Sequence, residues 1–173
     1  GAISLAYAFI GFALIIYRYG MDTALMKFSV QTSGYERIAH ITTIIISQIF
    51  TGCFFTFLIY GTRNYSAIWV LGTNKPEWMV FLCIILFFDS LWNLPLLILR
   101  SEEKAVPYIL LSLINVIATM VLNIIFVVYL AQGIEGVFRA NIIASVFLFL
   151  ISVPILFNRV KLSSFNKKIF KKI

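Results

Sequence analysis

Charged side chains are scarce in this sequence, and that scarcity limits the class of protein it can encode. Only 12% of the residues are Asp, Glu, Lys or Arg, whereas 61% are hydrophobic. A soluble globular domain is about a quarter charged and about half apolar, so this composition excludes an ordinary soluble domain. The sequence therefore predicts an all-α integral membrane protein, a bundle of membrane-spanning helices.

Histidine and cysteine, which often bind metals or carry out chemistry, are also rare. His40 is the only histidine, and it has no neighbouring cluster of carboxylates. Cys53 and Cys83 lie inside apolar runs, so we interpret them as small hydrophobic residues. The sequence contains no Gly-rich phosphate loop with its lysine and no nucleophile elbow. We predict no metal, no cofactor and no enzyme activity.

Five apolar runs are long enough, or nearly long enough, to cross a membrane. A helix needs ~20 residues to span a hydrocarbon core of ~30 Å. The first run is short for this task, and all five are listed here: 2–17, 38–60, 79–99, 107–130 and 137–157. The last segment, 158–173, alternates lysines with apolar residues and predicts a basic amphipathic segment lying on anionic membrane lipid.

The distribution of Lys and Arg predicts the orientation of the spans. The loops that follow the first and third runs, together with the basic tail, hold most of these residues, so they are predicted to be cytoplasmic. The net charge of +7 is then explained by the cytoplasmic surface and its lipid rather than by nucleic acid. The start of the chain is placed outside and is not a methionine, so we expect at least one further span upstream.

The third run carries Asp89 at its middle. A carboxylate at that depth costs on the order of 3 kcal/mol even on insertion scales. Helical periodicity places Asn93 and Arg100 on the same face, with Asn93 as the hydrogen-bonding neighbour of Asp89. Pro95 predicts a kink, because it frees a backbone carbonyl one turn earlier. Two interpretations remain open: Asp89 acts in gating, proton transfer or cation pairing, or it is a structural carboxylate bonded to a neighbouring helix.

Every span also carries a stripe of polar residues. The stripes outside the third span consist of Ser4, Gly11 and Arg18; His40, Ser47 and Thr51; Ser112, Asn115, Thr119 and Asn123; and Asn141, Ser145 and Ser152. Ser, Thr and Asn often hydrogen-bond between membrane helices, which is one interpretation of any single stripe. The five stripes together, with Asp89 at mid-depth, predict a hydrated cavity inside the bundle.

Three arginines complete the predicted site. Arg100 meets a headgroup or pyrophosphate at the cytoplasmic mouth, or it is an ordinary interface arginine. Arg18 belongs to the first cytoplasmic turn, where Asp22 pairs with Arg18 or with Lys27. Arg139 follows the outer turn and is either a cavity cation or a snorkelling interface residue.

Three stretches carry a resemblance to a known family. They are YGMDTALMKFSV at 19–30, NLPLLILRSEEKA at 93–105 and, more weakly, GIEGVFRANIIAS at 133–145. Their order and spacing resemble the polysaccharide biosynthesis proteins, the lipid-linked oligosaccharide flippases of bacterial envelopes. These belong to the multidrug/oligosaccharidyl-lipid/polysaccharide exporter superfamily. The resemblance implies twelve to fourteen spans in two bundles, of which these five are the second to the sixth, with the C-terminal half of the same chain as their partner.

The resemblance also implies a function in the bacterial inner membrane. A polyprenyl-pyrophosphate-linked oligosaccharide enters a central, often cationic cavity, and the two bundles rock to open that cavity to the other side. A first alternative is a multidrug exporter of the same superfamily, coupled to H+ or Na+ through Asp89. A second is a membrane-embedded glycosyl or acyl transferase of envelope synthesis, which requires catalytic carboxylates or a histidine near an interface.

Overall fold

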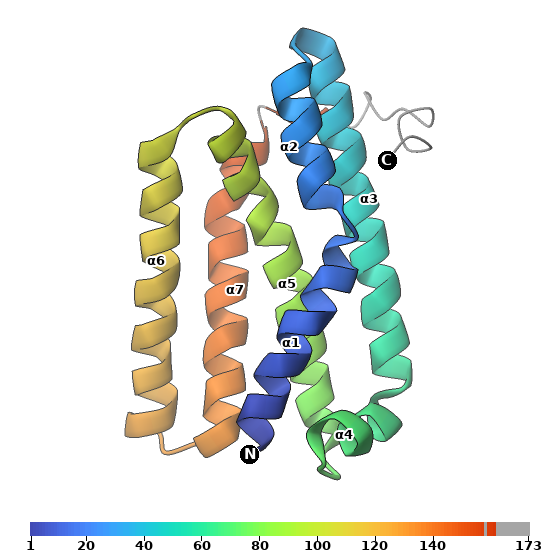
Figure 1. The fold of residues 1–173 in the computed structure, drawn as a ribbon. Helices are drawn as coiled ribbons and strands as arrows, with labels where there is room; N and C mark the ends of the chain where they lie inside the picture. Colours follow the sequence, from blue (N-terminus) through green and yellow to red (C-terminus); the bar gives the residue numbers. More distant parts are fainter. Residues whose placement is uncertain (158, 162–173) are drawn as a thin grey trace.

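The computed structural model describes residues 1–157 and 159–161, and its regular elements are all helices (Figure 1). In chain order these are α1 (Ala2–Arg18), α2 (Met21–Gln31), α3 (Gly34–Gly61), α4 (Arg63–Leu71), α5 (Pro76–Ser101), α6 (Ala105–Asn123), the π-helix η1 (Ile124–Tyr129) and α7 (Gly133–Phe157). The predicted amphipathic segment at 158–173 lies outside the described residues, apart from 159–161.

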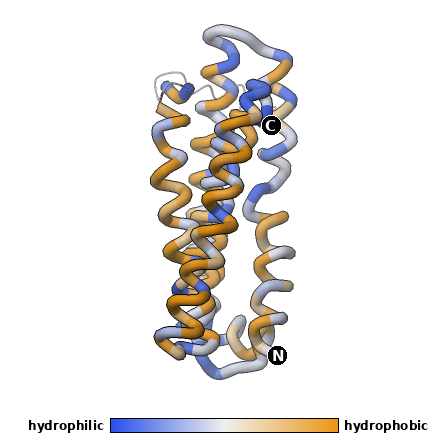
Figure 2. The backbone as a smooth tube through the Cα atoms, turned by 90° about the vertical axis from the view of Figure 1, so that its left-hand side faces the viewer, coloured by the Kyte–Doolittle hydropathy of each residue, from blue (hydrophilic) through white to orange (hydrophobic). Residues whose placement is uncertain are grey.

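Within residues 1–157 and 159–161, four helices are long and apolar enough to cross a membrane, and one bent pair passes the same test of length and composition only when its two helices are taken together. The four are α3, α5, α6 continued by η1, and α7, and the pair is α1 with α2. Hydrophobic residues follow the length of the helices, with hydrophilic residues at the ends of the bundle and at scattered positions between (Figure 2). The prediction of an all-α bundle is confirmed for the described residues, and their long apolar helices are compatible with a multi-pass membrane protein.

Helix α5 is the centre of the bundle. It packs against α1, α2, α3, α4, α6 and α7, and half of its 26 residues are buried. The helix continues from Pro76 to Ser101 with Pro95 in its interior. A proline inside a helix leaves one carbonyl without its amide partner, and this cost is tolerated where neighbouring elements surround the helix. The six other α-helices are therefore positioned relative to α5.

The break between α1 and α2 corrects the expected topology. The sequence stretch around Gly20 predicts a cytoplasmic turn, but α2 instead continues the path of α1 after a bend of 46°. Tyr19 and Gly20 both adopt positive φ angles, 42° and 74°, and end the first helix. The turn at this end of the bundle lies at Thr32 and Ser33 instead. Arg18 is thus placed halfway along a broken span and not in a loop.

The break is held by α3. The side-chain amide of Gln48 donates a 2.7 Å hydrogen bond to the backbone carbonyl of Tyr17, which lies in the last turn of α1. The hydroxyl of Tyr17 is in turn 3.0 Å from Oγ1 of Thr56 on the same helix. A helix end inside a bilayer needs such partners, because hydrocarbon offers its carbonyls none.

Helix α6 lies at the edge of the bundle. Its only buried residue is Leu111, and it packs mainly against α7. The backbones of η1 and α7 approach each other closely at Gly136. A Cβ at this position would lie only 2.8 Å from the carbonyl oxygen of Phe126, so the contact requires a glycine. One flank of α6 therefore remains open, and the polar residues of its inner face line a cavity.

Candidate functional site

A polar cavity of about 250 Å³ lies at the middle of the bundle. It is partly open and is lined by α1, α5, α6 and α7. Each of these helices contributes two lining residues: Leu14 and Arg18, Asp89 and Trp92, Asn115 and Thr119, and Asn141 and Ser145. Polar residues from four helices therefore meet in one place, where the polar stripes of the sequence predict a cavity.

Asp89 is held by α7 and by its own helix. Its Oδ1 accepts a 2.6 Å hydrogen bond from the hydroxyl of Ser145 and a 3.3 Å bond from the indole N–H of Trp92. Both bonds use the same oxygen, so Oδ2 keeps its capacity to accept a bond from a ligand. Asp89 is therefore bonded to a neighbouring helix, as its structural interpretation expects, and it also lines the cavity. Its role in gating, proton transfer or cation pairing stays a prediction.

Arg18 and Asp22 form an ion pair across the break between α1 and α2. The guanidinium Nη1 lies 3.3 Å from Oδ2 of Asp22, which confirms one of the two partners expected for that carboxylate. Asn93 donates to the same oxygen at 3.3 Å. The prediction that Asn93 is the hydrogen-bonding partner of Asp89 is therefore wrong. Asn93 bonds to Asp22 instead, because the bend between α1 and α2 brings that carboxylate beside α5. The pair ties both halves of the broken span to the central helix.

The amide side chains of α6 and α7 leave donors and acceptors for a ligand. Oδ1 of Asn115 accepts a 3.3 Å bond from Thr119, while its amide N–H groups make none that the structure records. Nδ2 of Asn141 donates to the hydroxyl of Tyr7 at 3.1 Å and to the carbonyl of Val137 at 2.8 Å, which leaves its Oδ1 as an acceptor. The cavity therefore offers both kinds of hydrogen-bonding group.

The polar stripe of the second span does not reach this cavity, so the expectation that five stripes converge is wrong for α3. Thr43, Ser47 and Thr51 each donate to the carbonyl four residues earlier in their own helix, at 2.6–2.8 Å. His40 stacks on Phe28 of α2, with ring centroids 4.3 Å apart. The polar groups of these residues are used within α3 and in its packing against α2 and α5, away from the cavity.

Four predicted site residues lie outside the cavity, and the first is Asn93, which bonds to Asp22. Asn123 is one turn beyond Thr119 and donates at 2.8 Å to the carbonyl of that residue. Arg100 is exposed at the last turn of α5. Arg139 is exposed at the opposite end, 3.9 Å from Glu135 and 3.2 Å from Gln132, in agreement with its interpretation as an interface residue.

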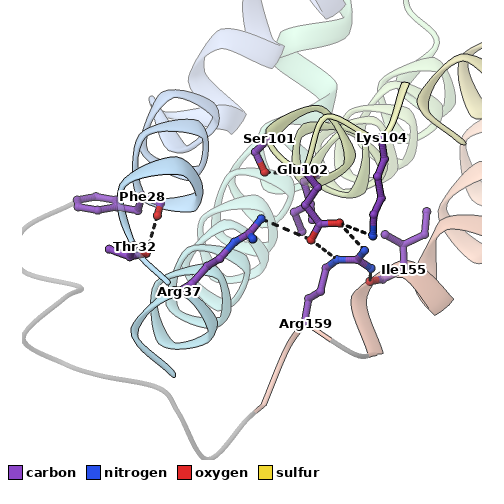
Figure 3. A network of polar contacts seen from close by, with 9 residues as sticks. Phe28, Thr32, Arg37, Ser101, Glu102, Lys104, Ile155 and Arg159 are labelled. Carbon is purple, nitrogen blue, oxygen red and sulfur yellow. Dashed lines mark hydrogen bonds and ion pairs between the residues drawn. The ribbon is translucent and has the colours of Figure 1, made fainter. Parts of the chain in front are cut away.

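One cluster of charges was not predicted from the sequence. The two carboxylate oxygens of Glu102 accept hydrogen bonds from one edge of the Arg159 guanidinium, Oε1 from Nε at 2.6 Å and Oε2 from Nη2 at 2.5 Å. Figure 3 shows this pair and its neighbours. Lys104 lies 3.0 Å away and Arg37 of α3 lies 3.4 Å away. This set, the Glu102 cluster, ties the ends of α3, α5, α6 and α7 together. Its residues are dispersed in the sequence, so spacing gave no signal for it.

The electrostatics of the Glu102 cluster follow from these contacts. Hydrogen bonds from Arg159 lower the pKa of Glu102 from 4.5 to about 2, and the same bonds raise the pKa of Arg159. The side chain of Glu102 is only 13% exposed, so the pair is shielded from water and salt. The carboxylate is therefore ionised at every physiological pH, so its ion pairs with the surrounding cations persist across that range.

The charge of the cavity differs from the cationic cavity that the resemblance implies. Its lining contains one cation, Arg18, and one carboxylate, Asp89, and the cation is already paired with a second carboxylate, Asp22. Within the described ranges, no group of three His, Cys, Asp or Glu side chains gathers closely enough to hold a metal ion. Comparison with protein families, with curated proteins and with solved structures finds no significant match to this chain.

Proposed function

We propose that this chain is part of a membrane transporter that moves a polyprenyl-pyrophosphate-linked oligosaccharide outward for bacterial surface polysaccharide synthesis. The observation that supports this most is the cavity, in which four membrane helices turn polar residues toward one another at mid-depth. Intramembrane polar residues that face a cavity commonly mark a substrate pathway. The resemblance of the stretches at 19–30 and 93–105 to the flippases supplies the substrate class.

The shape of the first span adds support. Discontinuous membrane helices that meet near the bilayer midplane are a recurrent feature of transporter binding sites. Here α1 and α2 break beside the cavity, and Arg18 and Asp22 lie on either side of the break. The oligosaccharide headgroup is strongly hydrated, so its passage through ~30 Å of hydrocarbon requires a polar path of this kind.

A cation-coupled multidrug exporter of the same superfamily is the second candidate. The observation that favours it is the balance of charge, since Asp22 already pairs with Arg18 and Asp89 has only neutral hydrogen-bond donors. An unpaired carboxylate at mid-membrane suits the binding of a proton or Na+.

The experiment that separates the candidates is deletion of the gene in its native host, followed by complementation. The deletion strain receives the wild-type gene, Asp89→Asn or the control Asn123→Ala, and both surface polysaccharide and lipid-linked precursor are quantified. The proposal predicts that deletion removes surface glycan and traps fully built precursor on the cytoplasmic side. It also predicts that Asp89→Asn restores little glycan and that Asn123→Ala restores nearly all of it.

Other results would overturn the proposal in a defined direction. Unchanged surface glycan with altered drug tolerance would support the exporter. Lost glycan with an incompletely built precursor would support the transferase. Full complementation by Asp89→Asn, together with trapped precursor in the deletion strain, would keep the transport function but remove this carboxylate from it.

A further inference from the structure

The cavity combines features that suit an uncharged, hydroxyl-rich ligand better than an anion. A phosphate group only accepts hydrogen bonds and is repelled by a carboxylate, whereas a sugar hydroxyl both donates and accepts. The lining presents Oδ2 of Asp89 and Oδ1 of Asn141 as acceptors and the amide of Asn115 as a donor. Among the described residues that line it, the one cation is Arg18, and its positive charge is already paired with Asp22.

We propose that this cavity binds a neutral sugar ring of the lipid-linked glycan through its hydroxyl groups, and that the pyrophosphate binds elsewhere. This inference rests on the proposed function and specifies which portion of the substrate the cavity takes. A volume of about 250 Å³ is below the ~300–1,000 Å³ of pockets that enclose a drug-sized ligand, so it suits one ring rather than a whole oligosaccharide.

Trp92 adds an apolar surface to this polar lining. Its indole N–H is fixed by Oδ1 of Asp89 at 3.3 Å, so the ring has a defined position at the wall of the cavity. An aromatic side chain joins a large apolar surface to a polar tip, which fits a sugar ring with its C–H groups and its surrounding hydroxyls. Asp89 thus positions Trp92 and Ser145 while one of its oxygens remains for the ligand.

The surplus of positive charge lies at one end of the bundle instead. Arg37, Lys104 and Arg159 surround the single carboxylate of Glu102, and Arg100 is exposed nearby at the end of α5. Arginine binds phosphate oxygens through a planar fork and lysine binds them as a point charge. An anionic group therefore finds its electrostatic partners at the helix ends and not in the mid-membrane cavity.

The test measures binding of free sugars to the intact purified protein in lipid nanodiscs by saturation-transfer NMR, which detects weak ligands. The probes are the methyl glycosides of glucose, galactose, mannose, rhamnose and N-acetylglucosamine, with sodium pyrophosphate as competitor. We expect at least one glycoside to give saturation-transfer signals that pyrophosphate does not displace. Asn115→Ala should weaken that binding about fivefold, the effect of one lost hydrogen bond.

Asn123→Ala is the matched control. Both asparagines lie on the polar face of α6, but only Asn115 lines the cavity, and α6 contributes little to the buried core. The control should bind the glycoside as the wild type does. Displacement of the sugar by pyrophosphate, equal binding in wild type and Asn115→Ala, or no signal from any glycoside would overturn the inference.

The outcome is separable from that of the proposed function. Sugar binding without trapped precursor in the deletion strain would keep the sugar site and remove the flippase assignment. Trapped precursor without sugar binding would keep transport and remove the sugar site from this cavity.

Discussion

The two ends of the bundle each hold one carboxylate among cations, yet the two sites differ in strength. Glu102 is 13% exposed and binds Arg159 through two short hydrogen bonds, with Lys104 and Arg37 beside it. Glu135 is 42% exposed, and its cations Lys75 and Arg139 lie 3.8 and 3.9 Å away. Ion pairs contribute measurably where geometry is good and solvent is excluded, and little at an exposed surface.

The end that holds Glu135 is stabilised by packing instead. Trp78 and Phe138 meet edge to face there, with ring centroids 5.8 Å apart. Both belong to an apolar cluster that also includes Met79, Leu82 and Leu71 from α4 and α5. One end of the bundle is therefore stabilised mainly by ion pairs and the other mainly by apolar side-chain packing. This difference can be tested by removing a packed side chain at one end and a charge at each end, and by comparing the melting temperatures.

The largest effect is expected from Phe138→Ala. This side chain is 2% exposed, and its removal leaves a cavity among α5 and α7 that costs roughly 3 kcal/mol. The measurement is the melting temperature of the purified protein in nanodiscs. Ile143→Ala, an exposed position on the same helix, is the control and should melt close to the wild type. Equal melting of Phe138→Ala and Ile143→Ala would contradict packing as the fastening of this end.

Glu102→Gln should have the next largest effect. The substitution keeps the shape of the side chain but leaves Arg159 and its neighbours without their counter-charge, at a cost of about 2 kcal/mol. The same melting assay should then show a decrease of roughly 4–8 °C. Glu103→Gln, the next residue in the same turn, is exposed and serves as the control. Unchanged melting of Glu102→Gln would show that the cluster carries no stability.

Acid should weaken the same end of the wild-type protein. The pKa of Glu102 is lowered from 4.5 to about 2 by folding, so its contribution is fully present above pH 4.5 and is lost as the pH falls through about 2. Melting followed from neutral pH downward should therefore show an acid-dependent decrease that is smaller in Glu102→Gln. Parallel pH profiles of the two proteins would contradict this origin of the stability.

Glu135→Gln should have the smallest effect. An exposed ion pair at nearly 4 Å contributes about 0–1 kcal/mol and is weakened further by salt. The melting temperature should therefore change by no more than about 4 °C, and high salt should remove the change. A decrease as large as that of Glu102→Gln would show that exposure does not account for the difference between the two ends.

The sequence was sufficient to predict the class of fold and part of the cavity. Low charge and long apolar runs predict the membrane helices, because backbone groups in hydrocarbon must be satisfied within a helix. Asp89, Asn115 and Arg18 line the cavity that their polar stripes predict. Helical periodicity reports which side chains share a face, so it finds such residues without a structure.

The rest depended on contacts between distant segments. Gly20 and the charged residues beside it predict a loop. The same residue types occur where a helix is broken within a span, so the sequence alone does not distinguish the two structures. The partner of Asn93 and the Glu102 cluster follow from the path that the chain takes after that break. The stripe on α3 has the same composition as the others, and only the packing of α3 behind α5 separates it from the cavity.

Accessibility of single cysteines to a membrane-impermeant thiol reagent tests the central claim, that a hydrated polar cavity lies inside the membrane. Cys53 and Cys83 are first replaced by alanine, and Asn115→Cys is compared with Val116→Cys, its neighbour on the outer face of α6. The thiolate is the reactive form and requires water. The cavity predicts fast labelling at position 115 and almost none at 116. Equal labelling, or labelling only at 116, would contradict it.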